Sequence, residues 1–362
     1  MSKSFIISDI HLGVHALHAE KWVKSARDYF FEWFIPMLKD KARPGDHLYF
    51  LGDIFHDRTS IYIPALLLAQ EIFEATTKIL PTHVMIGNHD MYSIIDPTQN
   101  SLRWLKHIDN LFFYERPKII TQDNKKIYIL PWIENRDEQM SLLLANKQCD
   151  YVFCHSELQG AFDNERKAID TLVRLNAFKH FNHVFSGHIH IRQTYGNFTY
   201  VGAPYHMDRA DKNDTKAVFI LDMKTGEIDT YENTYSPEYK TLEIATEEDL
   251  VKLSSSNVSH DMVDLVLNSN LLLDSKKARK SLLGLMENHV FERVEMFDTN
   301  KVKEPQLELK LDPDTFNWEI ETITVDFIKL QENMESEIKD EMINIFDKEV
   351  FTNYKKLTKG IL

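Results

Sequence analysis

The chain has 362 residues, of which 43% are hydrophobic and 11% aromatic, so it can bury a sizeable core and is not a disordered protein. Its formal net charge of −14 argues against a protein that coats nucleic acid through a basic surface, because such binding depends on Lys and Arg neutralising phosphates. The length predicts one large domain followed by something smaller.

Two cysteines, Cys149 and Cys154, are too few for a disulfide framework and match no zinc-finger spacing, which indicates a reducing compartment. A predicted strand follows residues 1–4 without a signal-type apolar segment. No apolar run approaches the roughly 18 to 20 residues of a membrane span. We therefore expect a soluble, cytoplasmic protein.

Five short apolar runs, rich in β-branched and aromatic residues, are typical of buried strands, and each ends at residues of a metal-binding type. In chain order they are residues 5–8 before Asp9 and His11, 48–51 before Asp53, 83–86 before Asn88 and His89, 151–154 before His155, and 183–186 before His188 and His190. Because open α/β sheets gather ligands beyond the carboxyl ends of their strands, these side chains can converge on one crevice.

Helical spacing separates the first strands, so this part of the chain alternates strand and helix and belongs to the α/β class. The apolar positions are Trp22, Ala26, Tyr29, Phe30, Trp33 and Met37, and later Leu66, Leu67, Ile72 and Phe73. A further strand is predicted at 127–130, and residues 208–216 are predicted to form a polar loop.

Carboxylates, imidazoles and one amide oxygen, without thiolates, suit borderline-to-hard ions such as Mn²⁺, Fe²⁺ or Zn²⁺. The pattern therefore predicts a binuclear metal site. Two divalent cations would add four positive charges where a phosphate would sit, so the acidic composition does not exclude a DNA substrate.

The order of the motifs resembles that of the calcineurin-like metallophosphoesterases over about residues 5–235. The motifs are Asp9-Ile10-His11, Gly52-Asp53, Gly87-Asn88-His89-Asp90, His155 and Gly187-His188-Ile189-His190. This resemblance implies a four-layer α/β/β/α sandwich. It also implies that Asp53 bridges two ions, one held with Asp9, His11 and His190 and the other with Asn88, His155 and His188. Such a pair shares a hydroxide and clamps phosphate oxygens.

The same resemblance gives His89 a role off the metals, where it stabilises the transition state or protonates the leaving oxygen, a contribution of roughly 10²–10⁴-fold. Asp90 would orient His89. The residues alone leave two other interpretations open, in which His89 is a spare loop residue and Asp90 is a helix N-cap.

His56 replaces the Asp that most members carry three residues after the bridging carboxylate. This feature is similar to the Mre-type double-strand-break repair nucleases, their SbcD relatives and phage recombination endonuclease subunits, in which that histidine helps place DNA. The resemblance implies a Mn²⁺-dependent exonuclease on duplex ends and endonuclease on single strands, in the host cytoplasm if a phage encodes it. His56 could also merely cap or pack a loop.

We assign residues 1–238 to the nuclease domain, 239–310 to a smaller α+β capping domain and 311–362 to a C-terminal helical segment. Thr246 to Asp249 predict a capping box. Strands at 262–267 and 290–297 flank a predicted helix at about 275–288. That helix carries a basic cluster, either a phosphate contact or a solvated face, made of Lys276, Lys277, Arg279 and Lys280.

A narrow apolar stripe on the last predicted helix suits docking on a partner helix or on its own domain. Its members are Phe327, Leu330, Met334, Ile338, Met342, Ile345 and Phe346. The resemblance implies an SbcC/Rad-type SMC ATPase as that partner, and it leaves a homodimer open.

Two rival functions share the same ligands. A small-nucleotide phosphodiesterase or phosphatase would not need the residues after 238. A catalytically silent scaffold on the same fold typically loses ligands or the catalytic histidine, whereas this chain keeps all of them.

Overall fold

The structure is a computed structural model, and it describes residues 2–14, 19–93, 95–255, 262–268, 275, 278, 282 and 293–297. The chain divides into two compact units, Met1–Glu238 and Tyr239–Leu362. Within the described ranges, no helix is both long enough and apolar enough to cross a membrane.

Two six-stranded mixed sheets form the first unit. The first has the order β14 (Ile228–Glu232), β13 (Ala217–Asp222), β1 (Lys3–Ile7), β2 (His47–Phe50), β3 (Thr82–Met85) and β6 (Leu111–Tyr114). The second has the order β11 (Gln193–Tyr195), β12 (Phe198–Tyr200), β10 (His183–Gly187), β9 (Tyr151–His155), β8 (Lys125–Leu130) and β7 (Lys118–Gln122). All six strands predicted for this unit are confirmed.

The strands that carry the site run parallel within each sheet. In the first sheet β1, β2, β3 and β6 are parallel, and β13 pairs antiparallel with β1. In the second sheet β8, β9, β10 and β12 are parallel, while β7 and β11 are antiparallel edges. Parallel strands place their carboxyl ends at one edge, which is the condition for ligands from different strands to meet.

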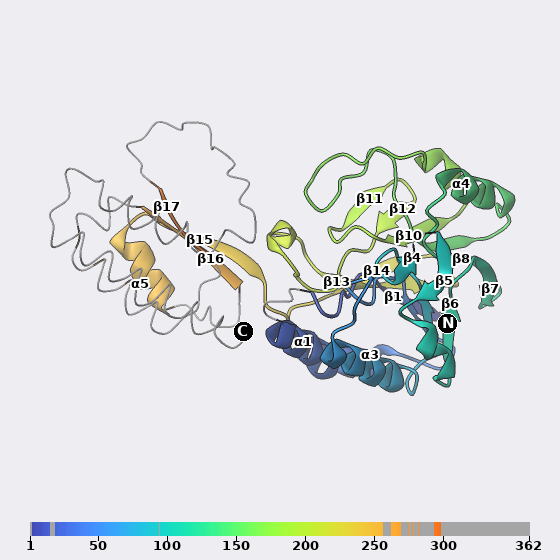
Figure 1. The fold of residues 1–362 in the computed structure, drawn as a ribbon, viewed down its shortest axis with the longest axis horizontal. Helices are drawn as coiled ribbons and strands as arrows, with labels where there is room; N and C mark the ends of the chain where they lie inside the picture. The colour runs from blue at the N-terminus through green and yellow to red at the C-terminus, as the bar shows by residue number, and fades with distance from the viewer. Residues whose placement is uncertain are drawn as a thin grey trace. The chain divides into compact units, whose positions relative to one another are not determined.

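Helices cover the outer faces of both sheets, which gives the predicted four-layer α/β/β/α sandwich. Alternate residues such as Ile6, Tyr49, Phe153 and Phe185 fill the core between the sheets. One side carries α1 (Ala19–Asp28), α2 (Ile35–Lys41) and α3 (Ile63–Thr76), and the other carries α4 (Arg136–Ala145) (Figure 1). Short elements complete the unit: β4 (Met91–Ser93), β5 (Asp96–Asn100) and 3₁₀ turns at Arg103–His107, Leu175–Ala177 and Arg209–Asp211.

The first predicted helix is present, but its centre is wider than an α-helix. Tyr29–Phe34 form a π-helical turn between α1 and α2. Five of these six residues are aromatic, and the rings of Tyr29, Phe30 and Phe34 are buried against one another. The extra width lets neighbouring bulky rings enter the same core.

The second unit contains a parallel three-stranded sheet in the order β15 (Tyr239–Ile244), β16 (Met262–Asn268) and β17 (Arg293–Phe297), together with α5 (Glu247–Ser255). The predicted capping box is confirmed, because Thr246 and Asp249 exchange backbone-to-side-chain hydrogen bonds of 2.9 and 3.3 Å. The four residues of the basic cluster, Lys276, Lys277, Arg279 and Lys280, lie outside the described residues, as does the predicted C-terminal helix.

A buried histidine in the first sheet predicts how stability depends on pH. His83 on β3 lies 2.8 Å from the Tyr114 hydroxyl and 2.8 Å from His47, and burial lowers the pKa of His83 to about 3. His83 therefore becomes protonated near pH 6.5 in the unfolded chain, but only near pH 3 in the folded protein. The stability that this neutral imidazole confers is complete above pH 6.5 and is lost as pH falls toward 3.

In His83→Gln the free energy of unfolding should fall less steeply as pH decreases below 6.5, by up to about 1.4 kcal/mol per pH unit. Urea unfolding of both proteins between pH 7 and pH 4.5 measures the slopes. Equal slopes would assign the acid sensitivity to other groups.

Candidate metal centre

The predicted ligands lie just beyond strand ends, on loops with unusual backbone conformations. Asp9 and His11 follow β1, Asp53 follows β2, and His188 follows β10. These four residues have positive φ angles of 53°, 41°, 53° and 91°. Non-glycine residues occupy this region at a cost, so such strain persists where surrounding packing enforces it and clusters at functional sites.

Two groups of side chains place ligand atoms within 4.8 Å of one another, namely Asp9 with His11 and His190, and Asp53 with His155 and His188. The groups are adjacent, because Asp53 Oδ2 lies 3.6 Å from His11 Nε2 and 3.3 Å from His155 Nε2. Asp53 therefore has the position that a bridging carboxylate requires.

Asn88 completes the second group. Its Oδ1 lies 3.0 Å from His155 Nε2 and 2.8 Å from His188 Nδ1. The His155 Nδ1–H donates to the Leu51 carbonyl at 2.7 Å, which turns Nε2 toward the oxygens of Asn88 and Asp53. A nitrogen lone pair facing two oxygens needs a positive charge between them, and a divalent cation supplies it. This donor set therefore fits a metal ion.

The electrostatics of the buried groups point the same way. Burial raises the pKa of Asp9 to about 7, and burial lowers the pKa values of His188 and His190 to about 3 and about 4. Burial opposes the protonation of His155, but the charge of Asp53, its hydrogen bond to the ring, the charge of Asp9 and the bond to the Leu51 carbonyl together raise that pKa to about 9. Neutral imidazoles are the form that binds metals, and the proton held by His155 occupies the place of a cation.

Glycines let the strand ends approach closely enough to gather these groups. A Cβ on Gly87 would lie 2.1 Å from Asp53 Oδ1, and one on Gly187 would lie 2.1 Å from Ser8 Oγ. A Cβ on Gly52, which has φ +102°, would lie 2.6 Å from the Gly87 nitrogen. The motifs therefore need Gly at all three positions for space, and at Gly52 for its conformation as well.

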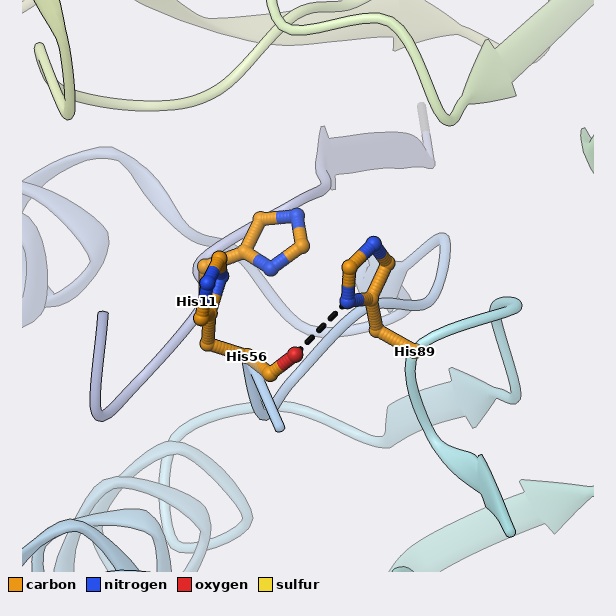
Figure 2. Close-up of side chains that lie close together, drawn as sticks. All are labelled: His11, His56 and His89. Carbon is orange, nitrogen blue, oxygen red and sulfur yellow. Dashed lines mark hydrogen bonds between the residues drawn. The ribbon is translucent and has the colours of Figure 1, made fainter. Parts of the chain in front are cut away.

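His89 and His56 lie on the solvent side of the cluster. Together with His11 they form a third group of close nitrogen atoms. The His89 Nδ1–H donates to the His56 carbonyl at 2.6 Å (Figure 2). The two rings stack at 5.5 Å, whereas each meets the His11 ring edge-on. His56 is exposed and His89 half-buried, so both can meet a substrate.

Asp90 has contacts other than those that the resemblance implied. Its carboxylate accepts hydrogen bonds from the backbone N–H groups of Asp53, Ile54, Phe55 and Gly87, at 2.8 to 3.2 Å. The bond that orients the His89 ring comes from His56. We therefore assign Asp90 to holding the Asp53 loop rather than to orienting His89.

Three side chains beside His188 were given no role by the sequence analysis: Trp132, Arg136 and Glu157. The ring centroids of Trp132 and His188 are 4.8 Å apart. The Arg136 guanidinium carbon lies over the indole of Trp132, 4.2 Å from the ring centroid. Arg136 also pairs with Glu157 at 3.2 Å. Trp132 follows a predicted strand end, and the segments that contain Trp132 and Glu157 both resemble the nuclease relatives, but the sequence did not indicate that these side chains meet beside His188.

The loop at 208–216 also differs from its prediction as a polar loop. Asp211 and Lys216 are 1% and 3% exposed, and they form an ion pair behind His190. The many charges in this stretch suggested solvation, but Asp211 and Lys216 neutralise each other in the interior, whereas Arg209 is exposed.

Comparisons with known proteins agree with this geometry. A family model described as calcineurin-like phosphoesterase matches residues 3–192. The chain is 26% identical over 226 residues to exonuclease subunit 1 of Enterobacteria phage T4, covering 60% of this chain and 64% of that protein. The chain thus spans less than two thirds of that relative's length.

Solved structures show a more distant likeness. An archaeal phosphodiesterase has 15% identity and a TM-score of 0.35, covering 64% of this chain and 99% of its own. The phosphopantetheinyl hydrolase of Mycobacterium tuberculosis has 13% identity and a TM-score of 0.32, covering 65% and 98%. With TM-scores this low, the assignment depends on the family match and the sheet topology. Because that match covers more than half of the chain, the protein belongs to the calcineurin-like phosphoesterase family, whose members use divalent metal ions.

Proposed function

We propose that the protein is a Mn²⁺-dependent DNA nuclease, an exonuclease on duplex ends and an endonuclease on single strands, that acts in recombination or double-strand-break processing. The observation that carries this proposal is the position of His56. Its exposed ring stacks on His89 and meets His11 edge-on, at the open side of an otherwise buried cluster. A histidine in this place can contact the backbone of a bound strand beside the scissile phosphate.

In this proposal seven residues hold two ions. One set is Asp9, His11 and His190, the other is Asn88, His155 and His188, and Asp53 belongs to both. When bound, the ions would lower the pKa of a water molecule and place positive charge beside the phosphate oxygens. When His89 carries two protons, the bond from Nδ1 to the His56 carbonyl leaves the Nε2 proton for the leaving oxygen.

The phage relative supports the DNA substrate and a partner, because its name describes a subunit of an exonuclease. We extend this to a complex with an SMC-type ATPase, docked by the segment at 311–362, for which the sequence predicts a helix. Mn²⁺ suits the mixture of carboxylate, amide and imidazole donors.

The test is degradation of end-labelled linear duplex and single-stranded DNA by the purified chain with Mn²⁺. We expect cleavage by the wild type and at least 100-fold less by Asp53→Ala, since that variant loses the shared ligand. Equal cleavage by both proteins would indicate a contaminating nuclease.

The same assay separates the rival function. Turnover of a small phosphodiester without DNA cleavage, even with an added ATPase partner, would favour a small-nucleotide phosphodiesterase. Cleavage only with the partner would support the nuclease within a complex.

A further inference from the structure

Among the described residues, the His190 ring shares with the His11 ring a buried Nδ1 that has no hydrogen-bond partner, unlike the ring of His155. In metal sites a ligating imidazole usually donates its second nitrogen to a carbonyl or carboxylate, which fixes the ring. His155 has such a bond to Leu51. The Nδ1 of His190 is buried and has no hydrogen-bond partner among the described residues, while its Nε2 lies 3.1 Å from His11 Nε2. Something other than a ring partner must orient this side chain.

The backbone of His190 is instead held by three distant segments. Its N–H donates to Asn164 Oδ1 at 2.7 Å. Its carbonyl accepts from the Ala203 N–H at 2.9 Å and from Lys216 Nζ at 2.9 Å. A Cβ on Gly202 would lie 2.7 Å from the same carbonyl oxygen, so the chain fits closely around it. Fixing the backbone limits the directions in which the imidazole can point.

Lys216 is an unusual residue to find behind this carbonyl, because its side chain is only 2% exposed. Nζ bonds to Asp211 Oδ1 at 2.5 Å and to Asp214 Oδ2 at 2.8 Å. The other Asp211 oxygen accepts from the backbone N–H groups of Met207 and Asp208. The three donor directions of the ammonium group are thus taken by two carboxylates and one carbonyl.

Stability alone does not account for such a network. Burying an ammonium and two carboxylates costs desolvation energy that their attraction only partly returns, and apolar replacements are often as stable. A network of this kind does fix geometry, because every member has a defined partner. The group whose geometry it fixes here is the backbone of a candidate metal ligand.

We propose that Lys216 is a positioning residue for one of the two metal ions: through the His190 carbonyl it sets the direction of the His190 imidazole and so the affinity for the ion beside Asp9 and His11. The other ion, beside Asn88, His155 and His188, does not depend on it. This proposal rests on the metal centre and not on the nature of the phosphoester substrate.

The experiment is calorimetric titration of the metal-free full chain with Mn²⁺, which needs no turnover. Lys216→Met alone leaves the buried carboxylate of Asp211 and the partly buried one of Asp214 without their cation, and it can fail to fold. The informative variant therefore also carries Asp211→Asn and Asp214→Asn, which removes all three charges together. Lys125→Met is the matched control, because Lys125 forms a partly exposed ion pair with Asp150 at the start of β8. His190→Ala and His188→Ala identify the two binding steps.

We expect two binding steps in the wild type and in Lys125→Met. In the triple variant one step should weaken by about 10–100-fold, as for loss of an outer contact to a ligand, and it should be the step that His190→Ala removes. Wild-type affinities for both ions in a folded triple variant would overturn the proposal. Equal weakening of both steps would overturn it as well, since it would make the network a general support of the fold. If neither variant folds, Asn164→Ala, which frees the other end of the His190 peptide, must weaken the same step, or the proposal fails.

Discussion

Replacing His89 by Ala is expected to lower kcat by roughly 10²–10⁴-fold while two metal ions stay bound. The ring of His89 is half-buried at the open side of the cluster, and its Nδ1 is committed to the His56 carbonyl. The backbone N–H of His89, which donates to Asp53 Oδ1 at 2.8 Å, is retained in the variant. Removing the imidazole therefore takes away a proton donor without removing the support of the bridging carboxylate.

Single-turnover cleavage of labelled DNA, or of a model phosphodiester if DNA is not cleaved, measures the effect on chemistry. Mn²⁺ calorimetry on the same sample counts the ions. His180→Ala is the matched control, since His180 is an exposed histidine outside the cluster and should leave both quantities unchanged. Loss of an ion together with activity would make His89 a structural residue of the metal site.

The strand ends could be predicted because two local signals coincide at them. Short runs such as 151–154 are apolar at every position, as expected for parallel strands covered on both faces, and each stops at a polar residue with metal-ligand chemistry. The parallel arrangement of the strands then brings these ends together within each sheet, and the packing of the two sheets, which the local sequence does not specify, brings the two sets together.

The supports behind the ligands could not be predicted in this way. Asp90 bonds to backbone groups 35 to 37 positions earlier in the chain, so its role depends on which loops lie side by side. Lys216 is similar, because the charges around it have the composition of a solvated loop. Whether such charges are buried depends on long-range packing, which local sequence does not contain.

The largest expected loss of stability is for Asp90→Asn, a change of nearly the same shape. Oδ2 accepts from the N–H groups of Asp53 and Gly87, and Oδ1 accepts from those of Ile54 and Phe55. An amide has one oxygen and one NH₂ group, so either orientation turns a donor toward two buried backbone donors. Leaving such groups unsatisfied costs about 1–3 kcal/mol each, which predicts a loss of about 3–5 kcal/mol in the free energy of unfolding.

Urea unfolding in the presence of a chelator measures this loss without the contribution of bound metal. Asp57→Asn is the matched control, because Asp57 is an exposed carboxylate that accepts from Thr59 and Ser60 in a neighbouring loop. That change should stay within about 1 kcal/mol. Because Asp90 fixes the loop that carries Asp53, Mn²⁺ affinity should fall in Asp90→Asn and not in Asp57→Asn. A stable Asp90→Asn protein with normal Mn²⁺ affinity would show that the Asp53 loop holds its strained conformation without this carboxylate.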